Sequence, residues 1–382
     1  MAVCLPWNRA EKGRRLMGKL KIGIIGCGAI AREKHVDALL QFPDRCEIVA
    51  LADAQPAAAN SLQRERLPGA AVYEGYEALL EDPAVDAVHI CTPNHSHCEI
   101  AVKALEAGKH VMCEKPMAET YADACRMIKT AEKNQRKLSV SYQNRFRSDS
   151  QAIHAAVLAG DLGEIYFAKA HATRRKKVPT WGSFLSLKAQ GGGSLIDIGT
   201  HSIDLALWFM DNYEVESVTA AAFRGLIDDP AGNLWGPWEP SRFEVEDSAF
   251  GFIRMKNGAL LTVEAAWALN IPDAREACVT VCGTKGGAQQ LPGDAPDSYQ
   301  WRLVKAVYGQ LVSVVPDGPE PQLWTGRKNG VDRAPLMEMD SWLEDLEGGR
   351  PHAVRAEQAA AVVQVIEAMY ESARQGRTIC LA

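Results

Sequence analysis

The residues best suited to acid–base chemistry lie in two short stretches of the chain. In the first, Asp197 and His201 are four residues apart in a segment with a helical pattern, so both side chains fall on one helix face and can contact each other. A carboxylate beside an imidazole fixes its tautomer and supports its charged form, which suits a general base near neutral pH. The alternative is that Asp197 caps the helix and His201 is a half-buried residue without a chemical role.

The second stretch is Glu114-Lys115-Pro116, which directly follows the apolar segment His110–Cys113. Pro116 keeps the backbone at Lys115 out of a helix. A lysine at the edge of a sheet is normally solvated, but a partly desolvated lysine beside a reacting hydroxyl can donate or accept a proton. Lys115 is therefore a third candidate catalytic group, provided that the fold brings the two stretches to one cleft.

A glycine-rich turn marks a candidate site for a dinucleotide. The apolar run Lys21–Ile25 is followed at once by Gly26-x-Gly28-x-x-Ala31 and a helical pattern, which predicts a buried strand, a tight turn and a helix N-terminus able to bind a pyrophosphate. The first glycine allows the turn, Gly28 lets phosphates approach the backbone, and the small Ala31 lets the helix pack on the strand. The alternative is a tight turn without a ligand.

An acid follows the next strand at the spacing expected for a ribose-binding carboxylate. The largely apolar segment Glu47–Ala52 leads directly to Asp53, which can accept hydrogen bonds from the adenosine ribose hydroxyls. Asp53 is followed by Ala54-Gln55-Pro56 and not by Arg or Lys, so NAD is favoured over NADP. The alternative is a surface acid that caps the next helix.

The first part of the chain predicts an α/β domain. From Lys21 to about Gln143, apolar strands alternate with amphipathic helical segments, the pattern that builds a parallel sheet with helices on both faces. The strands expected after the first two are Ala71–Tyr73, Val85–Thr92, His110–Cys113 and Lys137–Ser141. Ligands bind such sheets beyond the carboxyl ends of the strands, so the loops Thr92–His97 and Glu114–Pro116 are candidate site segments.

After Tyr142 the pattern changes to that of an α+β domain. Successive strands with few helices between them predict a mainly antiparallel sheet, and the turn Lys256-Asn257-Gly258 indicates a hairpin. The expected strands are Glu164–Thr173, Val215–Phe223, Asp247–Met255, Ala259–Leu269 and Ala277–Cys282. Helices are expected after Gly193 as far as Met210 and over Arg355–Arg374, whereas no element is assigned from Pro292 to Arg333.

The composition argues against several classes of partner. A formal net charge of −6, a pI near 5.9 and no long basic run argue against nucleic acid and anionic membrane surfaces, and no stretch is apolar enough to span a bilayer. Ten cysteines without a Cys-x-x-Cys pair are typical of reduced thiols in a cytoplasmic protein and predict neither disulfides nor a metal site. The basic segment Arg174–Lys177 is either a solvated loop or a local anion contact, which leaves an anionic substrate such as a uronate or a phosphorylated sugar open.

Taken together, these motifs resemble the Gfo/Idh/MocA family of oxidoreductases (glucose-fructose oxidoreductase, inositol dehydrogenase and rhizopine catabolism protein), from Lys21 to the end of the chain. The motifs that carry the resemblance are Gly26-x-Gly28-x-x-Ala31, Thr92-Pro93-Asn94 with His97, Ala107-Gly108-Lys109-His110-Val111, Glu114-Lys115-Pro116, and Gly192-Gly193 leading to Asp197-x-Gly199-x-His201-x-x-Asp204. The resemblance implies an α/β NAD-binding Rossmann domain (21–143) and an α+β substrate-binding and oligomerisation domain (144–382) with a large, open, mainly antiparallel sheet. Residues 1–20, which precede the first recognisable strand, are expected to be an N-terminal extension.

The resemblance also implies an activity and roles for individual residues. The activity is NAD(P)-dependent hydride transfer at a secondary hydroxyl of a sugar, glycoside or cyclitol, in a homodimer or homotetramer. His201, oriented by Asp197, would remove the hydroxyl proton while Lys115 stabilises the developing alkoxide. The expected cofactor contacts are Gly26, Gly28, Ala29, Ile30, Asp53, Thr92, Pro93, Asn94, His97, Glu114 and Lys115. The expected substrate contacts are Lys115, Asn144, Arg145, Trp181, Asp197 and His201.

The tryptophan in that set has its own physical reason. Sugars present apolar CH faces that stack on indoles, and Trp181, Trp235 and Trp238 lie in segments that read as loops. The alternative is that these side chains pack the second domain or a subunit interface.

Two other functions are open at this point. Some proteins of this architecture retain NAD and cleave a glycosidic bond by transient oxidation of the sugar, and the same three polar groups would serve that reaction. The second is a non-catalytic NAD-binding sensor, which would leave those three groups without a purpose. Product analysis separates the enzymes, because a dehydrogenase releases NADH whereas such a glycosidase releases an aglycone without net NADH.

Overall fold

The apolar runs in the first part of the chain form one parallel sheet. In the computed structural model, which describes residues 18–293, 299–316 and 333–381, six strands lie in the order β3-β2-β1-β4-β5-β6, and every pairing is parallel. The strands are β1 Leu20–Ile25, β2 Cys46–Ala52, β3 Ala71–Tyr73, β4 Ala87–Ile90, β5 His110–Glu114 and β6 Leu138–Ser141. Ile22 and Ile24 in β1 are fully buried because helices cover both faces. Residues 1–17 of the expected N-terminal extension lie outside the described residues.

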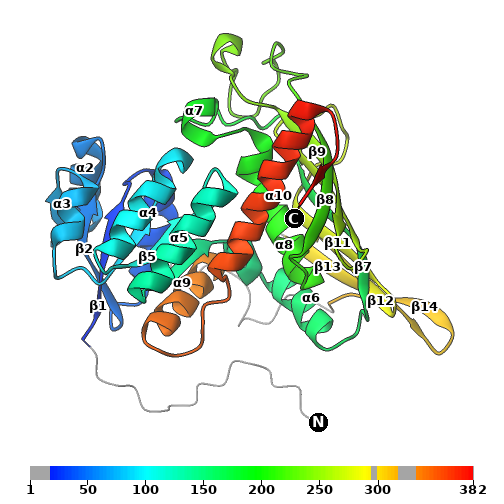
Figure 1. Cartoon of the computed structure of the whole chain (residues 1–382), viewed down its shortest axis with the longest axis horizontal. Coiled ribbons are helices and arrows are strands. Elements are labelled where there is room, and N and C mark those ends of the chain that lie inside the picture. The colour runs from blue at the N-terminus through cyan, green and yellow to red at the C-terminus, as the bar shows by residue number, and fades with distance from the viewer. Residues whose placement is uncertain (1–17, 294–298, 317–332, 382) are drawn as a thin grey trace.

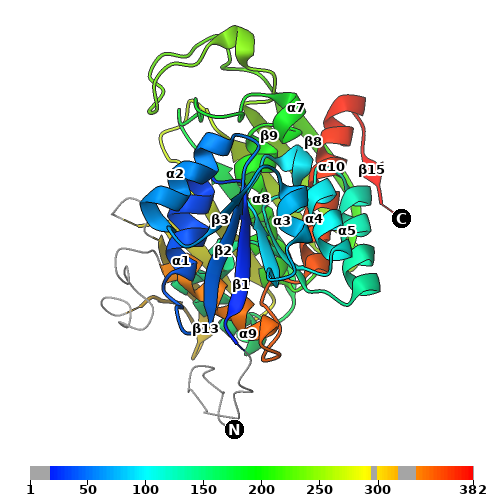
Figure 2. The same cartoon turned by 90° about the vertical axis from the view of Figure 1, so that its left-hand side faces the viewer.

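Helices lie on both sides of this sheet, with α1 and α2 on one side and α3, α4 and α5 on the other (Figure 2). The helical segments of this domain are η1 Ala31–Val36, which is π-helical, α1 Asp37–Leu39, α2 Pro56–Arg66, α3 Tyr76–Glu81, the 3-10 turn η2 Asn94–Ser96, α4 His97–Glu106 and α5 Tyr121–Asn134. The α1/α2 side also receives α9 (Arg333–Leu346), whose Met339 and Trp342 are fully buried in the core of β1 and β2. This helix is absent from the predicted elements, although it completes the first domain.

The later strands form a nine-stranded sheet in the order β14-β13-β12-β11-β7-β10-β9-β8-β15. Their bounds are β7 Ile165–Thr173, β8 Val215–Phe223, β9 Ser248–Met255, β10 Leu260–Ala266, β11 Arg275–Gly283, β12 Gly286–Pro292, β13 Tyr299–Val307, β14 Gln310–Val314 and β15 Ile379–Cys380. β7 and β10 pair in parallel, and the other neighbours pair antiparallel. The predicted α/β domain followed by an α+β domain is thus confirmed, whereas the hairpin of β13 and β14 lies where no element is predicted.

The helical segments of the second domain are η3 Gln143–Phe146, α6 Ser148–Leu158, α7 Leu187–Gln190, η4 Leu195–Gly199, α8 Thr200–Met210, η5 Pro240–Arg242 and α10 Ala356–Gln375. Of these, α8 and α10 lie between the nine-stranded sheet and the first domain (Figure 1). The chain through η4 and α8 matches the helix predicted as far as Met210, and α10 packs on both β8 and α5. On the opposite face of the sheet, Phe223 and Phe252 are 50% and 46% exposed.

The described residues contain neither a membrane-spanning helix nor a disulfide. No helix in them combines the length and apolar character of a membrane crossing, and no group of His, Cys, Asp and Glu side chains there is arranged to hold a metal ion. The nine cysteines in the described ranges are all unpaired.

Candidate active site

The glycine turn after β1 has the geometry that a dinucleotide pyrophosphate needs. Gly26 has φ +88°, and a Cβ there would lie 2.7 Å from the carbonyl of Cys91, so only glycine fits. A Cβ on Gly28 would meet nothing within 4 Å, which leaves open space above the turn. The helix begins at Ala29, and both Ala29 and Ile30 are exposed. N–H groups in the first turn of a helix have no partner within it, so this end can bind an anion.

Asp53 lies directly beside this turn. Its Oδ2 accepts a hydrogen bond of 2.7 Å from the backbone N–H of Cys27, and its Oδ1 accepts one of 2.7 Å from that of Gln55. These bonds fix the carboxylate at the carboxyl end of β2, next to the open space above Gly28. The arrangement fits the ribose and pyrophosphate of an adenine dinucleotide.

The loop after β4 is held together by a histidine. Both ring nitrogens of His97 lie 2.8 Å from backbone carbonyl oxygens, Nδ1 from Pro116 and Nε2 from Thr92, and the side chain is fully buried. The expectation that His97 contacts the cofactor is therefore corrected, because its ring joins the loops after β4 and β5 and does not reach the surface. Ser96 shapes the same loop by donating to Thr92 Oγ1 and to the carbonyl of Pro93 at 2.7 and 2.8 Å.

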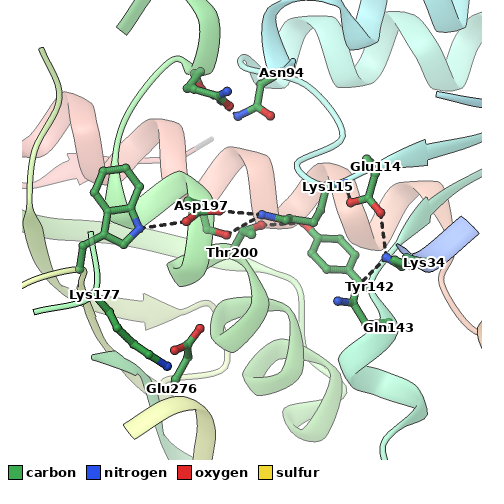
Figure 3. A network of polar contacts seen from close by, with 12 residues as sticks. Lys34, Asn94, Glu114, Lys115, Tyr142, Gln143, Lys177, Asp197, Thr200 and Glu276 are labelled. Carbon is green, nitrogen blue, oxygen red and sulfur yellow. Dashed lines mark hydrogen bonds and ion pairs between the residues drawn. The ribbon is translucent and has the colours of Figure 1, made fainter. Parts of the chain in front are cut away.

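Asn94 connects the two domains. Its Nδ2 donates to the carbonyl of Gln190 in α7 at 2.9 Å (Figure 3), and the neighbouring His95 lies 3.2 Å from the carbonyl of Ala189. The loop expected to contact the cofactor thus also contacts the second domain. Asn94, Thr92 and Pro93 stay predicted cofactor contacts.

Lys115, at the carboxyl end of β5, reaches across to the second domain. Its Nζ donates to both Oδ1 and the carbonyl of Asp197, each at 2.9 Å (Figure 3). The indole Nε1 of Trp267, the residue after β10, donates to Asp197 Oδ2 at 2.9 Å. Burial alone would raise the pKa of Asp197, but Lys115, Arg174 and Trp267 together hold that pKa below its usual value. Asp197 is thus a partly buried carboxylate anion with both oxygens engaged.

His201 lies on the next turn of the same helix but shares no hydrogen bond or ion pair with Asp197 within the described ranges. The expectation that Asp197 orients His201 directly is therefore corrected, because Lys115 and Trp267 occupy both Asp197 oxygens. His201 Nδ1 is buried and has no partner among the described residues, and the Tyr142 ring meets the imidazole edge-on at 6.2 Å. Burial and the charges of Lys115 and Lys34 lower the pKa of His201 to about 3, so the ring is neutral at neutral pH.

Glu114 points away from the cofactor side, into a buried polar network. Its Oε1 accepts from Lys34 Nζ and faces His35 Nε2, both at 2.8 Å, and its Oε2 accepts the Lys115 backbone N–H at 3.1 Å. Burial would raise the pKa of Glu114, but Lys34 and His35 hold it well below its usual value. The expected cofactor contact of Glu114 is corrected for its side chain, which is 5% exposed and supports the backbone that carries Lys115.

Arg145 is a structural residue and not a substrate contact. Its guanidinium is completely buried and donates to both oxygens of Asp204 at 2.9 and 2.6 Å, and to the Gln358 side chain at 2.7 Å. The expectation that it reads the substrate is therefore corrected, because no part of it is accessible. Asn144 is half-buried, and Trp181 is 49% exposed and packs edge-on against Trp235 at 4.9 Å. Both remain predicted substrate contacts.

Trp267 and Lys34 are the contributors to this site that the sequence reasoning missed. Trp267 lies within the predicted strand Ala259–Leu269 of the second, mainly antiparallel sheet, where the rule about carboxyl ends of parallel strands does not apply. Lys34 lies in the helix after the glycine turn, and its Nζ also bonds Gln143 Oε1 at 2.8 Å. The sequence offered one signal for Lys34, because a lysine on the buried face of a predicted helix needs an ionic partner nearby.

Comparison with known proteins gives the site its context. The family model described as "Oxidoreductase family, NAD-binding Rossmann fold" matches residues 20–142, and the one described as "Oxidoreductase family, C-terminal alpha/beta domain" matches residues 154–381. The chain is 34% identical over 360 residues to D-glucoside 3-dehydrogenase of Escherichia coli K12, an alignment that covers 94% of this chain and 97% of that one. It is 29% identical over 245 residues to myo-inositol 2-dehydrogenase of Thermotoga maritima, covering 64% and 68% of the two chains.

A solved structure agrees with the sequence relatives. The aldose-aldose oxidoreductase from Caulobacter crescentus, crystallised with glycerol, superposes with a TM-score of 0.76 at 27% identity, covering 95% of this chain and all of that one. The predicted NAD-type cofactor is confirmed by the description of the N-terminal family model. Both domains match, in order, over nearly the whole length, and the chain belongs to the Gfo/Idh/MocA family of NAD-binding oxidoreductases.

Proposed function

We propose that the protein is an NAD-dependent dehydrogenase that oxidises a secondary hydroxyl of a sugar, glycoside or cyclitol. The observation that carries the proposal is that Lys115 Nζ and the Trp267 indole each donate a hydrogen bond of 2.9 Å to Asp197, where the end of a Rossmann strand meets the second domain. The partly buried ion pair of Lys115 and Asp197 lies near the neutral imidazole of His201. A neutral imidazole can accept a hydroxyl proton, and the lysine ammonium can donate a hydrogen bond to the oxygen. Ligands of open parallel sheets bind beside such strand ends.

The first domain supplies the groups that would hold the cofactor. The residues proposed to contact it are Gly26, Gly28, Ala29, Ile30, Asp53, Thr92, Pro93, Asn94 and Lys115. When bound, the nicotinamide supplies a hydride acceptor. The positions directly after Asp53 carry no cation for a 2′-phosphate, which supports NAD as the cofactor and not NADP.

The remaining chemistry belongs to side chains of this chain. Lys115 Nζ would donate a hydrogen bond to the substrate oxygen and stabilise it as negative charge develops. His201, neutral before the reaction, would accept the hydroxyl proton at Nε2, since Nδ1 is buried. The charges of Asp197 and Glu114 favour the imidazolium that forms. Asp197 acts mainly by holding the Lys115 ammonium in place.

The substrate class follows from the relatives. The relative that aligns over nearly its full length acts, by its name, on D-glucosides at position 3, and a second acts on myo-inositol. Both substrates are rings that carry adjacent secondary hydroxyls. We therefore propose D-glucosides as the first substrates to test, with inositols next.

The uncovered sheet face supports the proposed homodimer or homotetramer. Phe223 and Phe252 are half exposed on the face opposite the helices, and an exposed aromatic patch of this kind marks an association surface. A cytoplasmic location is proposed on the unpaired state of the nine described cysteines.

The test is NADH absorbance with purified protein, NAD or NADP, and a panel of D-glucosides, free aldoses and inositols, with product analysis of every reaction. The proposal predicts NADH together with a keto sugar or keto cyclitol, and much lower turnover for His201→Ala at an unchanged Kd for NAD. Release of an aglycone without net NADH would show the redox glycosidase instead. Unchanged turnover of His201→Ala would refute the role given to that residue.

A further inference from the structure

A hollow of about 1000 Å³ is lined by Arg174, whose charge helps to lower the pKa of Asp197 in the candidate active site. One wall is the segment Arg174–Lys177, which follows β7, and another carries Glu276 and Tyr299. The segment is joined to the active site through Trp267, because the backbone N–H of Lys177 donates to the Trp267 carbonyl at 2.9 Å. Since the Trp267 indole in turn holds Asp197, the hollow is one residue away from the proposed catalytic groups.

The hollow does not contain the reacting groups themselves. Lys115, Asp197 and His201 are not among its lining residues. A substrate whose hydroxyl lies at Lys115 would reach the hollow only with a different part of the molecule, one that extends past Trp267. Figure 3 shows the arrangement, with Lys177 and Glu276 on one side of Asp197 and Lys115 on the other.

Among the described residues that line the hollow, cations outnumber carboxylates. Four consecutive cations line it, and Glu276 is the carboxylate among its lining residues. Arg174 donates to both oxygens of Glu276, and Lys176 Nζ lies 2.5 Å from Asp229 Oδ2. Arg175 and Lys177 have no ion pair with any carboxylate in the described ranges, and Arg175 is exposed. Their charges are thus available to an anionic ligand.

An aromatic platform adjoins these cations. Lys177 Nζ lies 5.5 Å and the Arg174 guanidinium 5.3 Å from the centre of the Trp235 ring. Trp235 is 37% exposed, and Trp181 packs edge-on against it. Exposed indoles can stack on the CH faces of sugars, so a stacking surface lies beside the cations that line the hollow.

We propose that this hollow recognises an anionic group, a carboxylate or a phosphate, on the part of the substrate that does not react, so that the enzyme acts on an acidic sugar or acidic glycoside. Arg175 and Lys177 are the specificity-determining cations. This inference rests on the proposed function for the reacting part of the substrate. It adds the charge of the remaining part and the residues that read it.

The test uses aryl D-glucosides of both anomers that differ only in a para carboxylate, phosphate or carboxamide group. The Kd of each glucoside for the enzyme–NADH complex is measured by calorimetry. The kcat/KM of each glucoside is measured from the rate of NADH formation in the presence of NAD. We expect the charged glucosides to bind about tenfold more tightly than the carboxamide at low ionic strength, as two partly exposed cations allow. This advantage should shrink at about 0.5 M salt. The carboxylate and phosphate arms identify which anion is preferred.

Two variants complete the test. The double variant Arg175→Gln/Lys177→Gln should bind all three glucosides with the same affinity. Its Kd for the carboxamide glucoside and its thermal unfolding midpoint should equal those of the wild type. Lys256→Gln, which removes an exposed cation at the other end of β10, should keep the preference.

Equal affinity of wild type for charged and neutral glucosides, or a preserved preference in the double variant, would overturn the inference. The binding arm is independent of turnover, so a charge preference without NADH formation would refute the proposed function and leave the anion site standing. NADH formation without a charge preference would do the reverse.

Discussion

Replacing Trp267 with phenylalanine removes the indole N–H that holds one oxygen of Asp197 at 2.9 Å. A hydrogen bond to a charged group contributes about 1.5 to 3 kcal/mol. If that contribution orients Lys115 for the transition state, kcat/KM should fall about 10- to 150-fold. The Kd for NAD should not change, because Trp267 lies in the second domain, away from the glycine turn. Trp267 is fully buried, so stability should also fall, by about 1 to 3 kcal/mol.

The assay must separate lost positioning from lost stability. Trp238→Phe is the matched control, because Trp238 is also buried and its Nε1 donates to the carbonyl of Ile227 at 2.7 Å, away from Asp197. Steady-state kinetics and urea unfolding are measured for both variants. The reasoning predicts similar losses of stability but a loss of kcat/KM in Trp267→Phe alone. Activity of Trp267→Phe within about twofold of wild type would refute it, as would an equal loss in Trp238→Phe.

Three further predictions concern residues whose roles the structure changes or defines. Arg145→Met should lower the free energy of unfolding by about 3 to 5 kcal/mol, because it leaves Asp204 as an unpaired buried charge. Urea unfolding measures this change. A variant as stable as the wild type but with weakened substrate binding would contradict the structural role of Arg145. Acidification should destabilise the protein between pH 6.5 and about 3, because burial lowers the pKa of His201 and of His352 to about 3 and the unfolded chain therefore binds more protons in that window. Unfolding at a series of pH values checks this, and His352→Gln should flatten the decline, whereas an unchanged slope would contradict it. Asp53→Ala should weaken NAD binding about tenfold and reduce the preference for NAD over NADP, measured by titration with each cofactor; an unchanged Kd ratio would remove Asp53 from the ribose site.

Local patterns in the sequence were sufficient for the parallel sheet, for strands β7 to β11 of the second sheet and for the glycine turn, but not for β12 to β15. Buried strands of a parallel sheet are apolar throughout, and the turn at Gly26 permits only glycine, so both leave direct signals. Helix α9 was not found, because it packs on strands more than 280 residues earlier in the chain and its amphipathic face has no local partner to indicate it.

In the candidate site, too, contacts between distant parts of the chain could not be predicted from local sequence patterns. Spacing placed Asp197 and His201 on one helix face, but the partners of Asp197 are set by the approach of Lys115 and Trp267 from two other elements. Arg145 follows a Rossmann strand, as a ligand contact would, yet the buried Asp204 from α8 pairs with it. Sequence spacing identifies which residue types are near a site, whereas their contacts depend on how the two domains meet.

The most direct test of the central claim is the rate of NADH formation from a simple alkyl D-glucoside by wild type and Lys115→Met, with the exposed Lys133→Met on α5 as the matched control. The account predicts NADH and a keto glucoside with wild type and Lys133→Met, and a loss of at least about 10³-fold in kcat for Lys115→Met, whose Kd for NAD stays within a few fold. NADH formation by Lys115→Met at the wild-type rate would contradict it.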